Sequence, residues 1–198
     1  MRHTGPVTAE AATQRMSYAD YAELERQGLG KHEYLRGEVV AMTDGTLEHA
    51  RLASQLAYLL GRELAGGSCR VFSSDLRVRI EATDLDTYPD LSVVCGDPQT
   101  AAADDHALLN PTLVIEVLSK STEGYDRGQK ASHYRRIPAL KGYLLVSQQT
   151  RQLELQTRRD DGSWTLLEAG PGEQLCIEAL GVTLDVDEVY QGSLGPQV

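Results

Sequence analysis

Two short and almost wholly apolar runs, each containing one carboxylate, constrain the fold of this chain more than any other feature. The runs are DLSVVC (residues 90–95) and LVIEVL (residues 113–118). Continuous apolar runs of this length are typical of central strands that are covered on both faces of a sheet. Asp90 begins the first run directly after Pro89, and Glu116 interrupts the second. Because an unpaired charge is costly in such surroundings, we expect both acids to have a partner.

The rest of the chain predicts helices beside this sheet and further strands within it. Leucines spaced three and four residues apart predict a helix over residues 46–64, and weaker patterns predict helices over 18–27 and 126–136. Residues 96–110 are expected to form a loop. The segment 33–43 is expected to form one long strand or a strand pair, with a tight turn or a bulge at Gly37. The other expected strands are 70–80, 142–147, 153–157 and 164–167. The predicted fold class is α/β or α+β, with a mixed central β-sheet flanked by helices.

The 198-residue length fits one globular domain. We expect a disordered N-terminal arm at 1–16, a single domain at 17–192 and a short C-terminal tail at 193–198. No stretch approaches the roughly 18 apolar residues that a membrane helix needs. The first residues also lack the apolar segment of a secretory signal. A cytoplasmic location is therefore expected.

The three cysteines agree with a reducing compartment. Cys69, Cys95 and Cys176 are odd in number, widely spaced, and form no CxxC pair. Neither a disulfide framework nor a zinc site is therefore expected.

The charge argues against a protein that coats nucleic acid without specificity. The chain has 19 Lys and Arg against 29 Asp and Glu, which gives a formal charge of −10. Such coating depends on Lys and Arg that release counterions from the phosphates. Most of the excess acid lies in residues 160–198, which contain no Lys or Arg. A transient encounter with DNA, bridged by a metal ion, is compatible with this distribution.

Three acids in apolar surroundings form a candidate metal site. The proline before Asp90 marks a strand start or a kink, which can turn this carboxylate toward a cleft. Glu116 takes the place of an apolar side chain, and Glu38 lies in the segment RGEVV. Acids that meet at one point repel one another unless a cation or a proton lies between them. Mg²⁺, or Mn²⁺ in its place, would bind Asp90 and Glu116 and polarise a phosphoryl oxygen.

Each of these acids also has a structural interpretation. Aspartate after proline is common in turns, so Asp90 alone is as readily structural as functional. The same holds for Glu38. Glu116 is harder to explain this way, although an edge strand or an arginine partner would satisfy it.

A cation near these acids is expected on the predicted helix at 126–136. Positions 126, 130 and 134 share one face of that helix, which places Lys130 beside Asp126 and Tyr134. Lys130 is a candidate for neutralising charge on a scissile phosphate or for orienting the attacking water. On residue type alone, a solvent-facing lysine paired with Asp126 is the simpler interpretation. Lys120 competes for the same role.

Two further residues are candidates for supporting roles. His49 points along the inward face of the helix at 46–64, either as a proton carrier near the acids or as a core histidine bonded to a carbonyl. Asp75 lies in SSDLRVRI, where a partnership with Arg77 or Arg79 is the favoured interpretation.

Several segments, taken in order, resemble the Uma-two family of restriction endonucleases. They are HEYLRGEVVAM, the helix with His49, VFSSDLRVRI, YPDLSVVCGD, PTLVIEVLSKSTEGYDRGQKASHYRRIPAL and YLLVSQ. The similarity extends from about Ser17 to Gly192, and its most specific part is the block EVLSKST–YDRGQK–HYRRIP. This family looks like a branch of the PD-(D/E)XK nucleases. The resemblance implies a restriction-endonuclease-like fold with the active site at one edge of a mixed sheet.

The resemblance also implies roles for individual residues. It places the metal-binding aspartate of these nucleases at Asp90, the acidic partner at Glu116 and the early acid at Glu38. One position departs from the pattern, because the expected lysine two residues after the acid is Leu118 here. Members with this arrangement look as though the lysine has moved to the next helix, which makes Lys130 its substitute.

The resulting hypothesis is a Mg²⁺-dependent endonuclease that hydrolyses phosphodiester bonds of DNA. Because restriction-type enzymes cut two strands by pairing active sites, a homodimer is expected by analogy. One rival hypothesis is an inactive interaction protein with the same fold, which the displaced lysine and the negative charge favour. The other is a hydrolase of a small phosphate ester. No glycine-rich phosphate loop, Ser-His-Asp spacing or HExxH motif points to another enzyme class.

Overall fold

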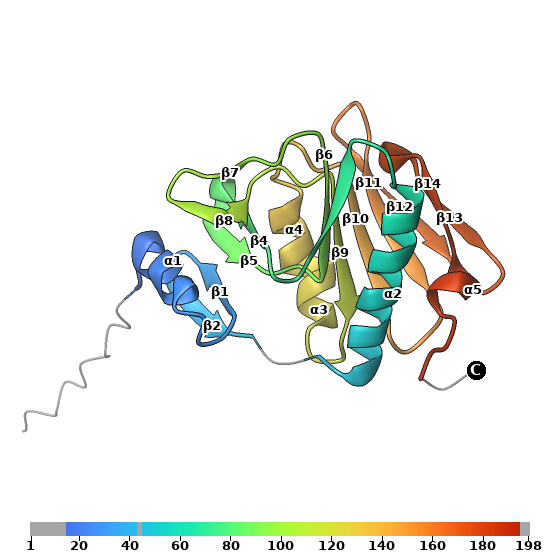
Figure 1. The fold of residues 1–198 in the computed structure, drawn as a ribbon, viewed down its shortest axis with the longest axis horizontal. Helices are drawn as coiled ribbons and strands as arrows, with labels where there is room; N and C mark the ends of the chain where they lie inside the picture. Colours follow the sequence, from blue (N-terminus) through green and yellow to red (C-terminus); the bar gives the residue numbers. More distant parts are fainter. Residues whose placement is uncertain (1–14, 43–44, 195–198) are drawn as a thin grey trace, which may run out of the picture.

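The computed structural model describes residues 15–42 and 45–194, and two six-stranded sheets form most of it (Figure 1). We call them the central sheet and the second sheet. In spatial order, the central sheet consists of β12 (Trp164–Ala169), β11 (Leu153–Arg158), β10 (Gly142–Ser147), β9 (Leu113–Leu118), β6 (Leu91–Cys95) and β3 (Cys69–Ser73). The second sheet consists of β2 (Glu38–Ala41), β1 (His32–Leu35), β5 (Leu85–Thr87), β4 (Arg77–Ile80), β8 (Asp104–Leu108) and β7 (Thr100–Ala101).

Helices and a hairpin complete the fold. The helical segments are α1 (Tyr18–Arg26), α2 (Leu47–Glu63), α3 (Glu123–Tyr125), the π-helical turn η2 (Asp126–Lys130), α4 (Ala131–Tyr134), α5 (Val186–Val189), and the 3₁₀ turns η1 (Glu81–Thr83) and η3 (Glu178–Leu180). The hairpin pairs β13 (Gln174–Ile177) with β14 (Val182–Asp185). Side-chain caps begin three helices, because Ser17 Oγ accepts from the Asp20 N–H, Thr46 Oγ1 from the His49 N–H and Asp185 Oδ1 from the Glu188 N–H.

The central sheet is mixed and covered on both faces. Strands β9 and β10 run parallel, and the other neighbours are antiparallel. Helix α2 lies on one side of β9, and the segment from α3 to α4 lies on the other (Figure 1). Ile115 and Val117 pack in the α2 core, whereas Val114 and Leu118 pack in the α4 core. By strand alternation, Glu116 therefore points toward the α3–α4 segment.

Most predicted elements are confirmed. The mixed sheet, the helix at Leu47–Glu63 and the two apolar central strands are present. The turn predicted at Gly37 joins β1 and β2, and there Arg36 has φ +51° and Gly37 φ +91°. The helix predicted at 126–136 begins three residues earlier, at Glu123, and includes the π-helical turn.

Two predictions about the elements are wrong. Residues 70–80 form two strands in different sheets, because a turn from Ser73 to Leu76 separates β3 from β4. The expected loop at 96–110 contains β7 and β8. The polar sequence of β8 is compatible with a partly buried strand, because buried Asp104 forms an ion pair with Arg77 of β4.

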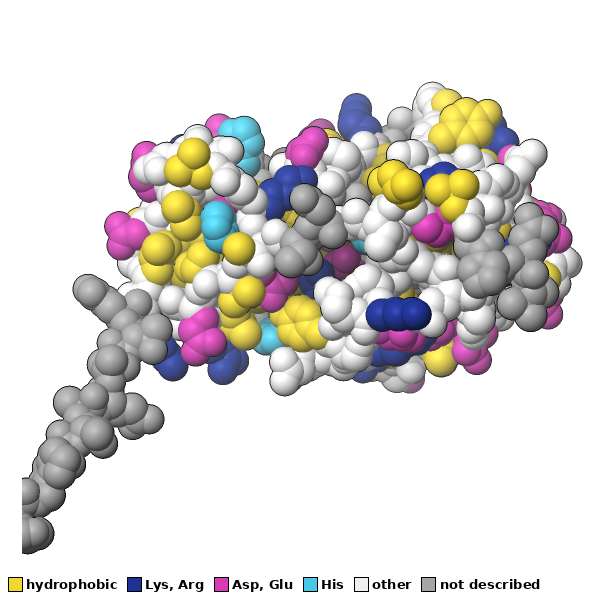
Figure 2. Space-filling model, turned by 90° about the horizontal axis from the view of Figure 1, so that it is seen from below, with side chains coloured by type: hydrophobic (Ala, Val, Ile, Leu, Met, Phe, Trp, Pro, Cys, Tyr) yellow, Lys and Arg dark blue, Asp and Glu magenta, His cyan; other side chains and the backbone are white. Residues whose placement is uncertain are grey.

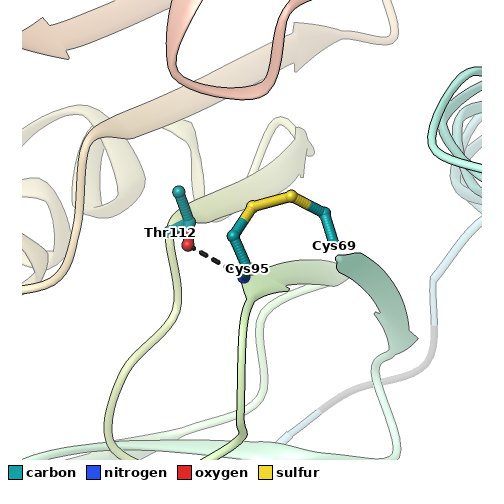
Figure 3. Close-up of a disulfide and its surroundings, with 3 residues drawn as sticks. All are labelled: Cys69, Cys95 and Thr112. Carbon is teal, nitrogen blue, oxygen red and sulfur yellow. Dashed lines mark hydrogen bonds between the residues drawn. A yellow bond between two sulfur atoms is a disulfide. The ribbon is translucent and has the colours of Figure 1, made fainter. Parts of the chain in front are cut away.

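A disulfide joins Cys69 to Cys95, so the expectation of no disulfide is wrong (Figure 3). The two cysteines lie directly opposite each other in the antiparallel pair β3–β6. Their separation of 26 residues does not reveal this register. The Cys95 N–H also donates to Thr112 Oγ1 at 3.1 Å, which attaches the end of β6 to the residue before β9.

Reduction of this disulfide is expected to lower the free energy of unfolding by about 2–4 kcal/mol, since it removes a cross-link from the unfolded chain. Urea unfolding with and without reductant measures the loss. Thiol titration of the unfolded protein is expected to find one group, Cys176, before reduction and all three cysteines afterwards. Three reactive thiols without any reductant would contradict the disulfide.

A group of buried charges lies beneath α1. Asp86 of β5 is fully buried, and Tyr18 Oη donates to its Oδ2 at 2.8 Å. Burial raises the pKa of Asp86 to about 7, against the attraction of Arg77. The two arginines of this group pair with other acids, Arg77 with Asp104 and Arg79 with Asp84. The folded protein therefore binds a proton at Asp86 at pH values where the unfolded chain has lost it.

Asp86→Asn is expected to remove one source of pH dependence. Between about pH 4 and pH 7 the wild type loses stability at this site as pH rises, because only its folded state holds the proton. Asparagine does not titrate and still accepts from Tyr18. The unfolding free energy of the variant minus that of the wild type should therefore rise by roughly 2–4 kcal/mol over this range. Urea unfolding at several pH values measures it, and a flat difference would contradict the raised pKa.

The predicted boundaries and location are not settled by the fold. Residues 1–14 and 195–198, most of the predicted arm and tail, lie outside the described residues. None of the described helices is long and apolar enough to cross a membrane. The domain limits at 17 and 192 and the cytoplasmic location stay predictions.

Candidate active site

A pocket of about 540 Å³, which we call the active-site pocket, opens where β9 ends. The elements that line it come from distant parts of the sequence: the hairpin β1–β2, the first turn of α2, the segment before β6, β9 itself and the helical segment α3–η2. Its lining includes the predicted site residues Glu38, His49, Asp90, Glu116 and Lys130.

Asp90 is held at the edge of the central sheet by two contacts. Leu91 lies opposite Ile115 in the β6–β9 pair, so Asp90 lies beside the last part of β9. The Val117 N–H donates to Asp90 Oδ2 at 2.7 Å, and His49 Nε2 lies 3.2 Å from the same oxygen. The ion pair with Asp90 raises the pKa of His49. No described residue forms a hydrogen bond or ion pair with the Oδ1 atom of Asp90.

Glu116 meets Lys130 in the interior. Lys130 Nζ lies 2.7 Å from Glu116 Oε1, and Tyr134 Oη donates to the same oxygen at 2.8 Å. Only 5% of either Glu116 or Lys130 is exposed, so their charges depend on each other. Asp126, one helical turn before Lys130, lies 3.6 Å from Nζ. The π-helical turn that contains Asp126 and Lys130 is a feature found often at functional sites.

The protonation of this group follows from burial and from its charges. Burial raises the pKa of Glu116 to about 8, and Asp90 adds to this effect while Lys130 opposes it. Burial opposes the charge of Lys130, but Glu116 and Asp126 outweigh it and raise the lysine pKa above its ordinary value. Burial likewise raises the pKa of Asp126. Lys130 therefore stays protonated, and Glu116 is the residue of the pair that holds a proton below about pH 8.

The carboxylates fit a metal ion that needs few protein ligands. No three His, Cys, Asp or Glu side chains of the described residues are grouped so that they could hold a metal among themselves. Asp90 Oδ1 and Glu116 Oε2 nevertheless have no partner among those residues, and Asp90 raises the pKa of Glu116 by repulsion. Mg²⁺ commonly binds through one or two carboxylates and keeps several waters. The pair Asp90 and Glu116 matches that requirement.

The other predicted acids are placed differently from this pair. Glu38 lines the same pocket but is exposed, and its carboxylate makes no hydrogen bond or ion pair with a described residue. Asp75 lies outside the active-site pocket and pairs with Lys31 at 2.8 Å. The predicted partnership of Asp75 with Arg77 or Arg79 is therefore wrong.

The cations also differ from the simplest expectation. Lys130 does pair with Asp126, but it is buried and its nearer partner is Glu116, so the solvent-facing interpretation is wrong. Lys120 is exposed and does not line the pocket. Arg79, one of the two arginines considered as a partner of Asp75, is buried against Tyr18 of α1.

Glu33 is a pocket residue that the sequence argument missed. Its Oε2 accepts from Thr87 Oγ1 at 2.7 Å, and its Oε1 accepts from the Tyr125 hydroxyl. A sequence signal for Glu33 was its position in β1 next to Tyr34. Because Tyr34 is buried and neighbouring side chains of a strand alternate, Glu33 points to the opposite face, toward the pocket. The hydroxyl contacts hold this carboxylate rigidly beside the Glu116–Lys130 pair.

The face on which α2 begins shows no broad basic surface. Seen from below, acidic, basic and hydrophobic side chains are interspersed among the described residues (Figure 2). The pocket itself is lined by five acids, Glu33, Glu38, Asp90, Glu116 and Asp126. These acids give the pocket lining an excess of carboxylates over cations, since Lys130 is its one Lys or Arg among the described residues.

The chain is similar to proteins of one family. The Uma2 family model, described as “Putative restriction endonuclease”, matches residues 18–187. “Uncharacterized protein slr1290” of Synechocystis sp. is 37% identical over 178 residues, which cover 90% of this chain and 93% of that protein. “Uncharacterized protein sll1609” of the same organism is 34% identical over 168 residues, covering 85% of this chain and 94% of that protein.

A solved structure shares the fold. The crystal structure of “a putative nuclease belonging to DUF820” from Anabaena variabilis has a TM-score of 0.68 at 14% sequence identity, and the match covers 85% of this chain and 96% of that one. The predicted restriction-endonuclease-like α+β fold is therefore confirmed. Since the family model spans most of the sequence and both relatives exceed 30% identity, this protein belongs to the Uma2 family.

Proposed function

We propose that this protein is a Mg²⁺-dependent endonuclease that hydrolyses phosphodiester bonds of DNA in the active-site pocket. The observation that carries the proposal is the meeting of Asp90, Glu116 and Lys130 in one pocket, with Lys130 Nζ 2.7 Å from Glu116 Oε1. Buried charges are costly, so a chain that keeps them at a pocket has a use for them. Membership of the Uma2 family supports nuclease chemistry.

Each residue has a defined task in this proposal. Asp90 and Glu116 would hold Mg²⁺ (or Mn²⁺), which when bound polarises a phosphoryl oxygen and acidifies a water. Val117 N–H and His49 fix one oxygen of Asp90, so the other oxygen is left for the ion. Lys130 keeps a positive charge beside the site of phosphoryl transfer, where charge accumulates in the transition state.

The remaining candidates support these residues. Tyr134 orients Glu116 through its hydroxyl. Glu38, which is exposed in the pocket, acts through water rather than by direct contact with the other acids. The homodimer expected by analogy stays a prediction.

Hydrolysis of a small phosphate diester is a second candidate function. The five acids of the pocket favour it, because they repel the many phosphates of a long nucleic acid more than a single diester. An inactive interaction protein is less well supported, since it has no need for a buried lysine between two carboxylates.

Hydrolysis assays with the full chain test the proposal. The substrates are plasmid DNA, oligonucleotides and bis(p-nitrophenyl) phosphate, each with Mg²⁺, with Mn²⁺ and with EDTA. DNA cleavage that requires the metal and Asp90 is the expected result. Cleavage that persists in EDTA or in Asp90→Asn would contradict it. Hydrolysis of the small diester without DNA cleavage would favour the second candidate.

A further inference from the structure

A second hollow of about 850 Å³ adjoins the active-site pocket and has no part in the chemistry described above. It lies between α2, the segment after α1 and the turn that follows β3. The residues that line both hollows are Met42, Gly45, His49, Tyr88 and Asp90. The two hollows therefore share a boundary that contains the proposed metal-binding aspartate.

The position of Asp90 on this boundary matters for the shape of the substrate. A phosphodiester has two ester substituents, which extend from the phosphorus atom in different directions. Both need space when the phosphorus is held beside Asp90 and Glu116. Glu116 lines the active-site pocket only, and Ser54 lines the second hollow only. A chain of nucleotides that reacts at Asp90 thus has room for one arm on each side of the boundary.

The hollows have the size and the walls to hold single nucleotides. Both volumes fall in the range of about 300–1,000 Å³ that is usual for pockets of small-molecule ligands. Ala53 and Ala57 line the second hollow from α2, and their short side chains leave it open. In the active-site pocket, Val40 and Met42 are 63% and 38% exposed and present an apolar surface on which a base can lie.

The lining of the two hollows offers few cations to the phosphates of a nucleic acid. Binding of a duplex depends on many contacts between phosphates and Lys or Arg. Across both hollows the lining contains two such residues, Lys31 and Lys130, and no arginine. Each is already paired, Lys31 with Asp75 at 2.8 Å and Lys130 with Glu116 at 2.7 Å. The lining therefore suits contact with bases, while contact with a phosphate is confined to the metal ion that Asp90 and Glu116 would hold.

We propose that the substrate is an unpaired DNA strand that crosses the Asp90–His49 boundary with one nucleotide arm in each hollow. The inference rests on the proposed nuclease function and narrows its substrate. Bases of a duplex are stacked and paired, so they enter such hollows only after they have been unpaired, at a cost of a few kcal/mol. A strand that is already single pays no such cost.

Ser54→Trp is the variant that tests the second hollow. Ser54 is exposed on α2 and lines this hollow alone, so tryptophan fills it without changing the core. The matched control is Glu63→Trp, which places the same side chain at an exposed position of α2 outside both hollows. The substrates are an oligonucleotide, its duplex with the complement, and bis(p-nitrophenyl) phosphate, all with Mg²⁺.

The expected results concern both cleavage and binding. The wild type cleaves the single strand roughly tenfold or more faster than the duplex, and Ser54→Trp lowers the ratio of strand cleavage to small-diester hydrolysis by roughly tenfold or more. Glu63→Trp keeps the wild-type ratio. Binding is measured separately, by the fluorescence anisotropy of a labelled strand with Ca²⁺ in place of Mg²⁺, and the wild type is expected to bind the strand more tightly than the duplex.

Other results would overturn the inference. Equal cleavage and binding of strand and duplex would do so, as would a Ser54→Trp protein that binds and cleaves the strand like the wild type. Failure of the proposed nuclease function would give a different pattern from failure of this inference. No diester substrate would then be hydrolysed, while the fluorescence anisotropy would still report whether the strand or the duplex binds. Strand binding that Ser54→Trp removes would support the inference even then.

Discussion

Replacing Asp90 by asparagine is expected to lower Mg²⁺-dependent DNA hydrolysis by roughly a hundredfold to a thousandfold. Asparagine has the same shape and can still accept the hydrogen bond from Val117 N–H, which the aspartate accepts at 2.7 Å. It lacks the negative charge that binds a divalent cation. The loss should therefore appear in metal binding and in the rate, and not in the fold.

Three measurements separate these effects. Calorimetric titration with Mg²⁺ reports binding, the hydrolysis rate across a range of Mg²⁺ reports catalysis, and thermal unfolding reports the fold. Asp105→Asn is the matched control, since the Asp105 side chain is 89% exposed on β8 and outside the pocket. An Asp90→Asn protein that binds Mg²⁺ and cleaves DNA as the wild type does would exclude Asp90 as a metal ligand.

Replacing Lys130 by methionine is expected to destabilise the protein by roughly 3–5 kcal/mol near neutral pH and to lower hydrolysis roughly a hundredfold. The variant leaves Glu116 buried, with Tyr134 as its hydrogen-bond donor. Burial raises the pKa of Glu116, and loss of the cation removes the attraction that opposes this rise, so Glu116 holds its proton to a higher pH. Urea unfolding and the hydrolysis rate are the two measurements.

The loss of stability should depend on pH in a known direction. In the unfolded chain Glu116 ionises near its ordinary pKa of 4.5. The folded wild type and the folded variant both keep this proton up to about pH 8, so they lose stability together between pH 4.5 and pH 8. Above that pH only the variant still holds the proton, at a cost of about 1.4 kcal/mol for each pH unit. The destabilisation by Lys130→Met should therefore change little between about pH 5 and pH 8 and grow at higher pH. A loss that does not change with pH would contradict a buried, ionisable partner.

A second substitution distinguishes stability from catalysis. Lys130→Met combined with Glu116→Gln removes both charges, and stability is expected to return to within about 1 kcal/mol of the wild type. Hydrolysis should stay low, because the cation and a metal ligand are both absent. Lys120→Met, at an exposed lysine outside the pocket, is the matched control. If Glu116→Gln does not rescue the Lys130 variant, the two residues do not depend on each other in solution.

Part of the site could be predicted from the sequence because burial leaves a local pattern. Continuous apolar residues around Glu116 indicate a central strand, and an acid within such a strand needs a partner. The i, i+4 spacing placed Asp126, Lys130 and Tyr134 on one face of a helix, and all three lie around Glu116. The turn at Gly37 was also readable, since glycine readily adopts positive φ.

Other features could not be predicted, because they depend on which distant segments pair. The second sheet was missed because β4 and β8 are short, and β8 is polar. Asp75 was assigned an arginine partner from nearby in the sequence, whereas its partner, Lys31, is more than 40 residues away. The register of β3 against β6, which places Cys69 opposite Cys95, has no local signal.

The sequence by itself determined that one carboxylate lies within an apolar strand, that another directly precedes one, and that a lysine follows on a helix. The hydrophobic pattern and the cost of a buried charge, from which this follows, are local properties. The tertiary structure alone decided that Lys130 points inward to Glu116, that Glu33 joins the pocket, and that Asp90 separates two hollows. Those facts arise from the packing of segments far apart in the chain. Side-chain direction at such contacts is set by the partner, which no local pattern contains.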